Sequence, residues 1–281
     1  HPFPPTMRFQ VSGRLEYDVA QPSTLILTIH AQRNASQTIL EEHFSVEPYV
    51  KVEEFLADGG ENRFVRLETG RKKRLAIEYQ ATVDVNHELV PARKLDALPV
   101  SALDRRVIPY LFPSRYCQSD RLGRLAWDLF GKIEHPYEKV VAVADWISQN
   151  VEYVRGSTNS ETSAFDTVTQ RTGVCRDYAH LATTLCRCMN IPARYVTGYL
   201  GDIGVPPSAS PMDFSAWFQV YLSGAWRTVD ARHNVPRIGR ILMGRGRDAT
   251  DVAISTSFGP STLAGFTVIT EEVSVPKAQV A

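Results

Sequence analysis

The stretch Thr172-Gly-Val-Cys-Arg-Asp177 opens a run of apolar residues at helical spacing and decides the fold of the second half of this chain. The spacing predicts a helix that begins near Cys175 and stops at Pro192. Its inward face consists of Tyr178, Ala182, Leu185 and Met189. Strand-like segments follow over residues 193–200, 215–222, 225–231, 252–258 and 266–273. Helices followed by strands indicate an α+β domain.

The chain before this stretch shows two kinds of pattern. Apolar residues at helical spacing predict one helix over Leu122–Phe130 and a second helix that Pro136 opens. The first ninety residues instead alternate apolar and polar positions, as in Leu75–Val85, and such strands separated by turn residues indicate a β-sandwich. We therefore expect a β-sandwich domain at residues 1–98 and an α+β domain at residues 99–281.

Composition and charge narrow the possible partners. Lys and Arg together number 31, as do Asp and Glu, so no net charge attracts nucleic acid or an anionic membrane, and we expect neither as a partner. No stretch approaches the ~18 apolar residues of a membrane span, and no amino-terminal apolar run resembles a signal peptide. Four cysteines are too few for a disulfide scaffold. We expect a cytoplasmic protein with free thiols and without a metal or organic cofactor, and the oligomeric state stays open.

Cys175 is the cysteine best placed for chemistry. At the amino-terminal end of a helix, unpaired N–H groups and the helix dipole favour a thiolate over a thiol. A cysteine nucleophile also needs a base and a group that orients the base. The alternative is a small buried apolar residue, which suits Cys186 and Cys188 well.

The group that orients the catalytic base is expected on a β-hairpin. Ser223-Gly224 is a two-residue hairpin signal, and if Leu222 pairs with Ala225, then Trp217 faces Asp230. Ser215 and Asp230 are then diagonal neighbours on one face of the sheet. Asp230 ends its strand, where a carboxylate is easily presented. Trp217 is expected in the core, and the four arginines between residues 237 and 247 are expected to form a solvated basic loop rather than an anion site.

Several of these segments resemble the bacterial transglutaminase-like superfamily. The resemblance rests on residues 173–181 and 191–199, on Ser215-Ala-Trp217 and Trp226-Arg-Thr-Val-Asp230, and on Pro113–Cys117 after a β-rich region. It implies an amino-terminal β-sandwich followed by a papain-like α+β catalytic domain. It also implies a cysteine–histidine–aspartate triad in which Cys175 is the nucleophile and Asp230 the aspartate, with Ser215 at the histidine position.

Serine at position 215 breaks the triad, because a hydroxyl takes up no useful proton near neutral pH. His233 is the candidate replacement base: in strict register it faces away from Ser215, but a turn or bulge after Ala231 could swing it back. The alternative for His233 is a loop residue that caps the chain. His180 lies about 140° around the helix from Cys175 and is expected to pack.

The leading hypothesis is acyl transfer, or amide and peptide hydrolysis, through a Cys175 thioester on a peptide or amide substrate. A second hypothesis is a catalytically inactive protein that uses the fold for binding or scaffolding, which Ser215 favours. A third is an enzyme in which Ser215 only hydrogen-bonds the substrate, and water or the substrate amine serves as base.

Overall fold

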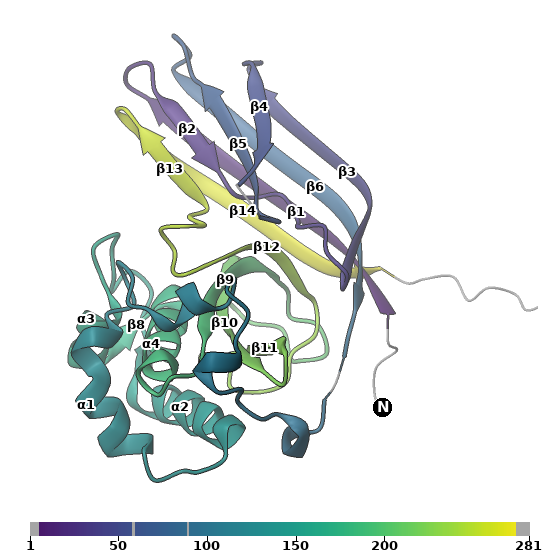
Figure 1. The fold of residues 1–281 in the computed structure, drawn as a ribbon. Helices are drawn as coiled ribbons and strands as arrows, with labels where there is room; N and C mark the ends of the chain where they lie inside the picture. The colour runs from purple at the N-terminus through teal and green to yellow at the C-terminus, as the bar shows by residue number, and fades with distance from the viewer. Residues whose placement is uncertain (1–5, 58–59, 89, 274–281) are drawn as a thin grey trace, which may run out of the picture.

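Two four-stranded sheets form the β-sandwich at one end of the molecule (Figure 1). The computed structural model describes residues 6–57, 60–88 and 90–273. One sheet has the order β14-β1-β6-β3 and the other β13-β2-β5-β4. The strands are β1 (Thr6–Val19), β2 (Thr24–Leu27), β3 (Gln37–Glu47), β4 (Val52–Leu56), β5 (Arg63–Glu68), β6 (Arg74–Asn86), β13 (Ser255–Phe258) and β14 (Ser261–Val273). Alternate residues of β1 and β6 are buried between the sheets, as their period of two predicts.

The sandwich takes strands from both ends of the chain. β14 pairs with β1 from Arg8↔Val273 to Val19↔Ser261, and β13 pairs with β2. A division of the chain at residue 98 therefore does not separate the strands of this sandwich, because residues 255–273 belong to its sheets.

The second part of the molecule is a four-stranded sheet with helices on one side (Figure 1). Its strand order is β11-β10-β9-β12. The helices are η1 (Ala92–Lys94), η2 (Val100–Ala102), η3 (Ile108–Leu111), α1 (Ser119–Phe130), α2 (Pro136–Asn150), α3 (Ala164–Gln170) and α4 (Cys175–Cys188). The strands are β7 (Glu152–Tyr153), β8 (Thr172–Gly173), β9 (Ala193–Leu200), β10 (Phe214–Leu222), β11 (Ala225–Val229) and β12 (Arg240–Gly246). This α+β arrangement after a β-sandwich confirms the expected fold class.

The helix and hairpin predictions are confirmed where the pattern is strong. α4 begins at Cys175, and the hairpin pairs Leu222 with Ala225 as expected. β12 was missed, because its arginines and glycines over residues 240–246 suggested a loop.

β9 joins the two parts of the molecule. All eight of its residues are buried, because α4 packs on one face of its sheet and the sandwich lies against the other. The Tyr199 hydroxyl donates to the carbonyl of Ile29 at 2.7 Å, and Tyr199, Ile241 and Met243 belong to the apolar core of the sandwich. The sheet that contains β9 is thus packed against the sandwich.

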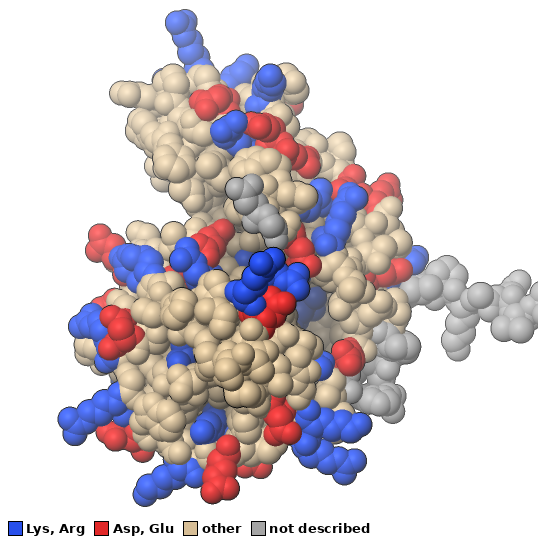
Figure 2. All heavy atoms as spheres, viewed as in Figure 1, with Lys and Arg blue, Asp and Glu red and all other residues tan. Residues whose placement is uncertain are grey.

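On the face shown in Figure 2, Lys and Arg side chains are interspersed with Asp and Glu. Among the described helices, none has the length and hydropathy needed to cross a membrane.

Candidate functional site

The amino-terminal end of α4 is held in place by Asp177. Its Oδ2 accepts hydrogen bonds from the Val174 N–H and the Thr158 hydroxyl, each at 2.8 Å. A carboxylate in the first turn satisfies a free N–H group and complements the helix dipole. Gly173 permits this close approach, because a Cβ there would lie 2.8 Å from the Asp177 Cβ. The motif therefore fixes Cys175 as the first residue of the helix.

The Cys175 side chain lies against a small apolar cluster that includes Tyr195 and Ala216. Burial raises the pKa of the Cys175 thiol to about 11, while the charge of Arg232 and a backbone hydrogen bond from Ala216 lower it in part. Contrary to the expectation of a thiolate, the thiol form therefore dominates at neutral pH in the free protein. Loss of hydration outweighs the favourable position at the helix terminus.

Asp230 follows the last residue of β11 and is buried. Its Oδ2 accepts from Arg240 Nη2 at 2.7 Å and faces His233 Nδ1 at 2.8 Å. Its Oδ1 accepts the N–H groups of Arg232 at 2.9 Å and His233 at 3.3 Å. Burial alone would raise the pKa of this carboxyl, but the His233 hydrogen bond and the Arg240 charge hold it well below its ordinary value. Asp230 is thus a fixed carboxylate.

His233 is brought to Asp230 by a turn that follows β11. Of the turn or bulge expected after Ala231, the structure has a turn, at residues 231–233, and it directs His233 to Asp230. Since Nδ1 faces a carboxylate, that nitrogen carries the proton and Nε2 is left as the acceptor. Nε2 makes no hydrogen bond within the described residues, so it is available to take a proton.

Arg240 is the partner of Asp230 that the sequence did not reveal. The solvated basic loop expected at residues 237–247 is wrong for three of its four arginines, whose side chains are at most 16% exposed: Arg237, Arg240 and Arg245. Arg240 lies on β12, and its guanidinium also lies 4.9 Å from the Trp217 ring centroid. Trp217 is 1% exposed, which confirms it as a core residue.

Ser215 lies on β10 beside Ala216, whose backbone contacts the Cys175 thiol. It pairs with Gly198 of β9 and is buried. Its Oγ makes no hydrogen bond to any described residue. A buried hydroxyl without a partner is costly unless a ligand or water satisfies it.

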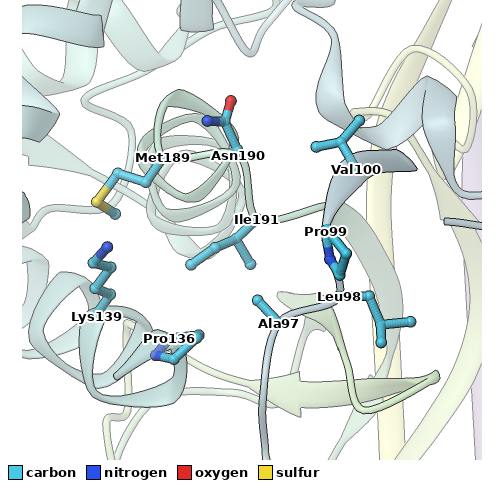
Figure 3. Close-up of a pocket in the computed structure, with 9 residues that line it drawn as sticks. All are labelled: Ala97, Leu98, Pro99, Val100, Pro136, Lys139, Met189, Asn190 and Ile191. Carbon is cyan, nitrogen blue, oxygen red and sulfur yellow. The ribbon is translucent and has the colours of Figure 1, made fainter. Parts of the chain in front are cut away.

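Two other features lie apart from the candidate site residues described above. His180 is buried between the rings of Tyr116 and Tyr195, and its Nε2 accepts the N–H of Ala249 at 3.0 Å, so it packs as expected. A pocket of about 290 Å³ lies at the opposite end of α4, about 20 Å along the helix from Cys175. Figure 3 shows Met189, Asn190 and Ile191, which follow α4, among the residues that line this pocket.

The structure therefore places Asp230 and His233 together, and places Ser215 next to the strand position that contacts Cys175. The charges of Asp230 and Arg232 act on the Cys175 thiol, so the turn after β11 borders the helix terminus. Sequence reasoning missed Arg232, Tyr153 and Asp213, which interact electrostatically with the same thiol.

Two family descriptions match the chain. Residues 7–106 match the bacterial transglutaminase N-terminal domain, and residues 124–231 match the transglutaminase-like superfamily. The crystal structure of a candidate cysteine protease from Cytophaga hutchinsonii is 45% identical, with a TM-score of 0.91 over 96% of this chain and 92% of that chain.

Curated relatives match less than half of the chain. An uncharacterized protein of Mycobacterium leprae is 38% identical over 126 residues, which are 43% of this chain and 44% of that protein. Kyphoscoliosis peptidase of Homo sapiens is 30% identical over 128 residues, covering 43% of this chain and 19% of the peptidase. The chain thus spans less than half the length of these curated relatives.

Proposed function

The chain belongs to the transglutaminase-like superfamily, and from this premise we propose that it hydrolyses or transfers amide acyl groups through a thioester on Cys175. The observation that carries the proposal is the His233–Asp230 pair at 2.8 Å, whose carboxylate charge also acts on the Cys175 thiol. It supplies the base and the orienting carboxylate that a cysteine nucleophile requires.

In the first step, His233 Nε2 takes the proton of the neutral thiol while the sulfur of Cys175 bonds to the substrate carbonyl carbon. The carbonyl oxygen becomes an oxyanion that the backbone N–H of Cys175 stabilises. Collapse of this intermediate breaks the C–N bond, and the amine leaves with the proton from His233. Asp230 remains ionised throughout and orients the imidazole.

In the second step, His233 removes a proton from water or from an acceptor amine, which attacks the thioester carbonyl. The C–S bond breaks, and the sulfur regains a proton as the acid or the new amide is released. Ser215 Oγ, which has no partner among the described residues, is available to hydrogen-bond the substrate. The proposal thus assigns Ser215 a binding role and no proton transfer.

A binding or scaffolding protein is the second candidate function. One observation favours it, since burial raises the pKa of the Cys175 thiol. The resemblance also favours it, because it implies that Ser215 takes the position of the superfamily's histidine. Under this alternative, Cys175 reacts no faster with acyl donors than an ordinary partly exposed thiol.

The test is to incubate the protein with p-nitrophenyl acetate and locate any acyl group by intact-mass and peptide mass spectrometry. We expect one acetyl group on Cys175 that hydroxylamine removes, and none in Cys175→Ala. Cys188→Ala, which removes a thiol from the other end of α4, should acylate like the wild type. Absence of acyl-Cys175 in the wild type would support the binding protein.

A further inference from the structure

We propose that Arg232 binds an anionic group, such as a carboxylate, that the acyl donor carries next to its reactive carbonyl. This inference rests on the proposed function, because it assigns the substrate class of the same site. Substrates would be peptides or amides with a carboxylate close to the scissile bond.

The first observation is that the Arg232 guanidinium forms no ion pair within 4.0 Å with any described residue. Its backbone N–H donates to Asp230, but within the described part of the chain its guanidinium makes no salt bridge and no hydrogen bond. The carboxylate that could neutralise it is already occupied, since Asp230 is bound by Arg240 and His233. A partly buried guanidinium without an anion is a favourable position for a substrate carboxylate, which it can bind with two parallel hydrogen bonds.

The second observation is that this guanidinium is held in position. It lies 3.9 Å from the centroid of the Tyr153 ring, a stacking geometry that restricts its rotation. Tyr153 of β7 pairs with Gly173 of β8, and Gly173 stands two residues before Cys175. The guanidinium is therefore anchored to the same segment that presents the thiol, and its charge acts on that thiol.

The surroundings leave the site positively charged. Arg155 donates to the carbonyl of Pro211 at 3.4 Å, which places a second arginine between the loop after β7 and the loop before β10. Asp213 is the neighbouring carboxylate, but it forms no ion pair within 4.0 Å with any described residue. The charges of two guanidinium groups thus act on one carboxylate, which leaves these three side chains with a net positive charge.

The experiment compares alkylation of Cys175 by iodoacetate, an anion, and by iodoacetamide, its neutral analogue. For each reagent, the alkylation rate of Cys175 is divided by that of the neutral model thiol N-acetylcysteine amide, which cancels the intrinsic reactivity of the reagent. The ratio of interest is the corrected rate with iodoacetate divided by the corrected rate with iodoacetamide. Any effect of Arg232 on thiol ionisation changes both rates equally and leaves their ratio unchanged. The ratio therefore measures anion binding alone.

We expect the wild type to favour iodoacetate by about tenfold after this correction. Arg232→Gln should lose this preference, Arg232→Lys should keep part of it, and Asp213→Asn should increase it by removing the competing carboxylate. Arg124→Gln, the same charge change at an exposed position of α1, should leave the ratio unchanged. Circular dichroism checks that the variants are folded.

A wild-type ratio equal to that of the model thiol, or the same ratio in wild type and Arg232→Gln, would overturn the inference. Neither result depends on acyl transfer, since alkylation needs only an accessible thiol. Failure of the proposed function would instead appear as absent acylation with the iodoacetate preference intact.

Discussion

Replacing Arg240 by methionine removes the charge opposite Asp230 while keeping most of the side-chain volume. The two groups meet at 2.7 Å, with side chains 12% and 4% exposed. Breaking a buried ion pair by removing one partner costs about 3–5 kcal/mol, because the remaining charge is buried without compensation. His233 and two backbone N–H groups still bind Asp230 here, so we expect about 3 kcal/mol at about pH 7.

The pH dependence identifies the cause. In the wild type the pKa of Asp230 lies well below its ordinary value, so its stabilising contribution is complete above the unfolded pKa of about 3.9 and is lost as pH falls through the folded pKa. Without Arg240, burial raises the Asp230 pKa, and the carboxyl protonates at a higher pH. The difference in unfolding free energy between wild type and variant should therefore shrink from about pH 7 to about pH 4.

Urea unfolding followed by circular dichroism at both pH values provides the measurement. Arg8→Met is the matched control, because Arg8 binds Asp84 in a pair whose side chains are 29% and 22% exposed. That change should cost less than about 1 kcal/mol. A loss for Arg240→Met that equals the control, or that stays constant between the two pH values, would refute the electrostatic role assigned to Arg240.

Two further predictions concern the start of α4. Because burial raises the pKa of Cys175 to about 11, the rate of its alkylation by iodoacetamide should keep increasing about tenfold per pH unit up to about pH 9. A rate that levels off near the ordinary cysteine pKa would contradict this. Gly173→Ala should destabilise the protein by about 1–3 kcal/mol in urea unfolding, because the new Cβ collides with Asp177. Gly123→Ala, at an open position of α1, should be neutral or stabilising, and equal effects at both sites would count against the close approach at Gly173.

Local patterns in the sequence predicted the elements whose apolar residues recur at a regular spacing. α2 buries one face, and its apolar spacing showed where that face lies. The spacing also predicted α4, although α4 is buried around its whole circumference from Asp177 to Arg187. β12 escaped prediction, because two glycines and two arginines in seven residues leave little apolar pattern. It is a strand because β9 and the sandwich enclose it, and this enclosure depends on contacts far apart in sequence.

The sequence likewise predicted some residues of the candidate site and not others. Cys175 and Asp230 follow from short motifs, and the hairpin register from Leu222 to Ala225 placed Asp230 beside Trp217. The position of His233 depends on the dihedral angles of a turn, which a strand pattern does not specify. Arg240 reaches Asp230 only because β12 pairs with β9.

The central proposal is that the His233–Asp230 pair activates Cys175 for acyl transfer. The most direct test is the rate constant for acetylation of Cys175 by p-nitrophenyl acetate, measured by stopped flow in the wild type and in His233→Gln. We expect the variant to be slower by about 10²–10⁴-fold, the usual contribution of a general base. Acetylation of Cys175 at the wild-type rate in His233→Gln would contradict the proposal.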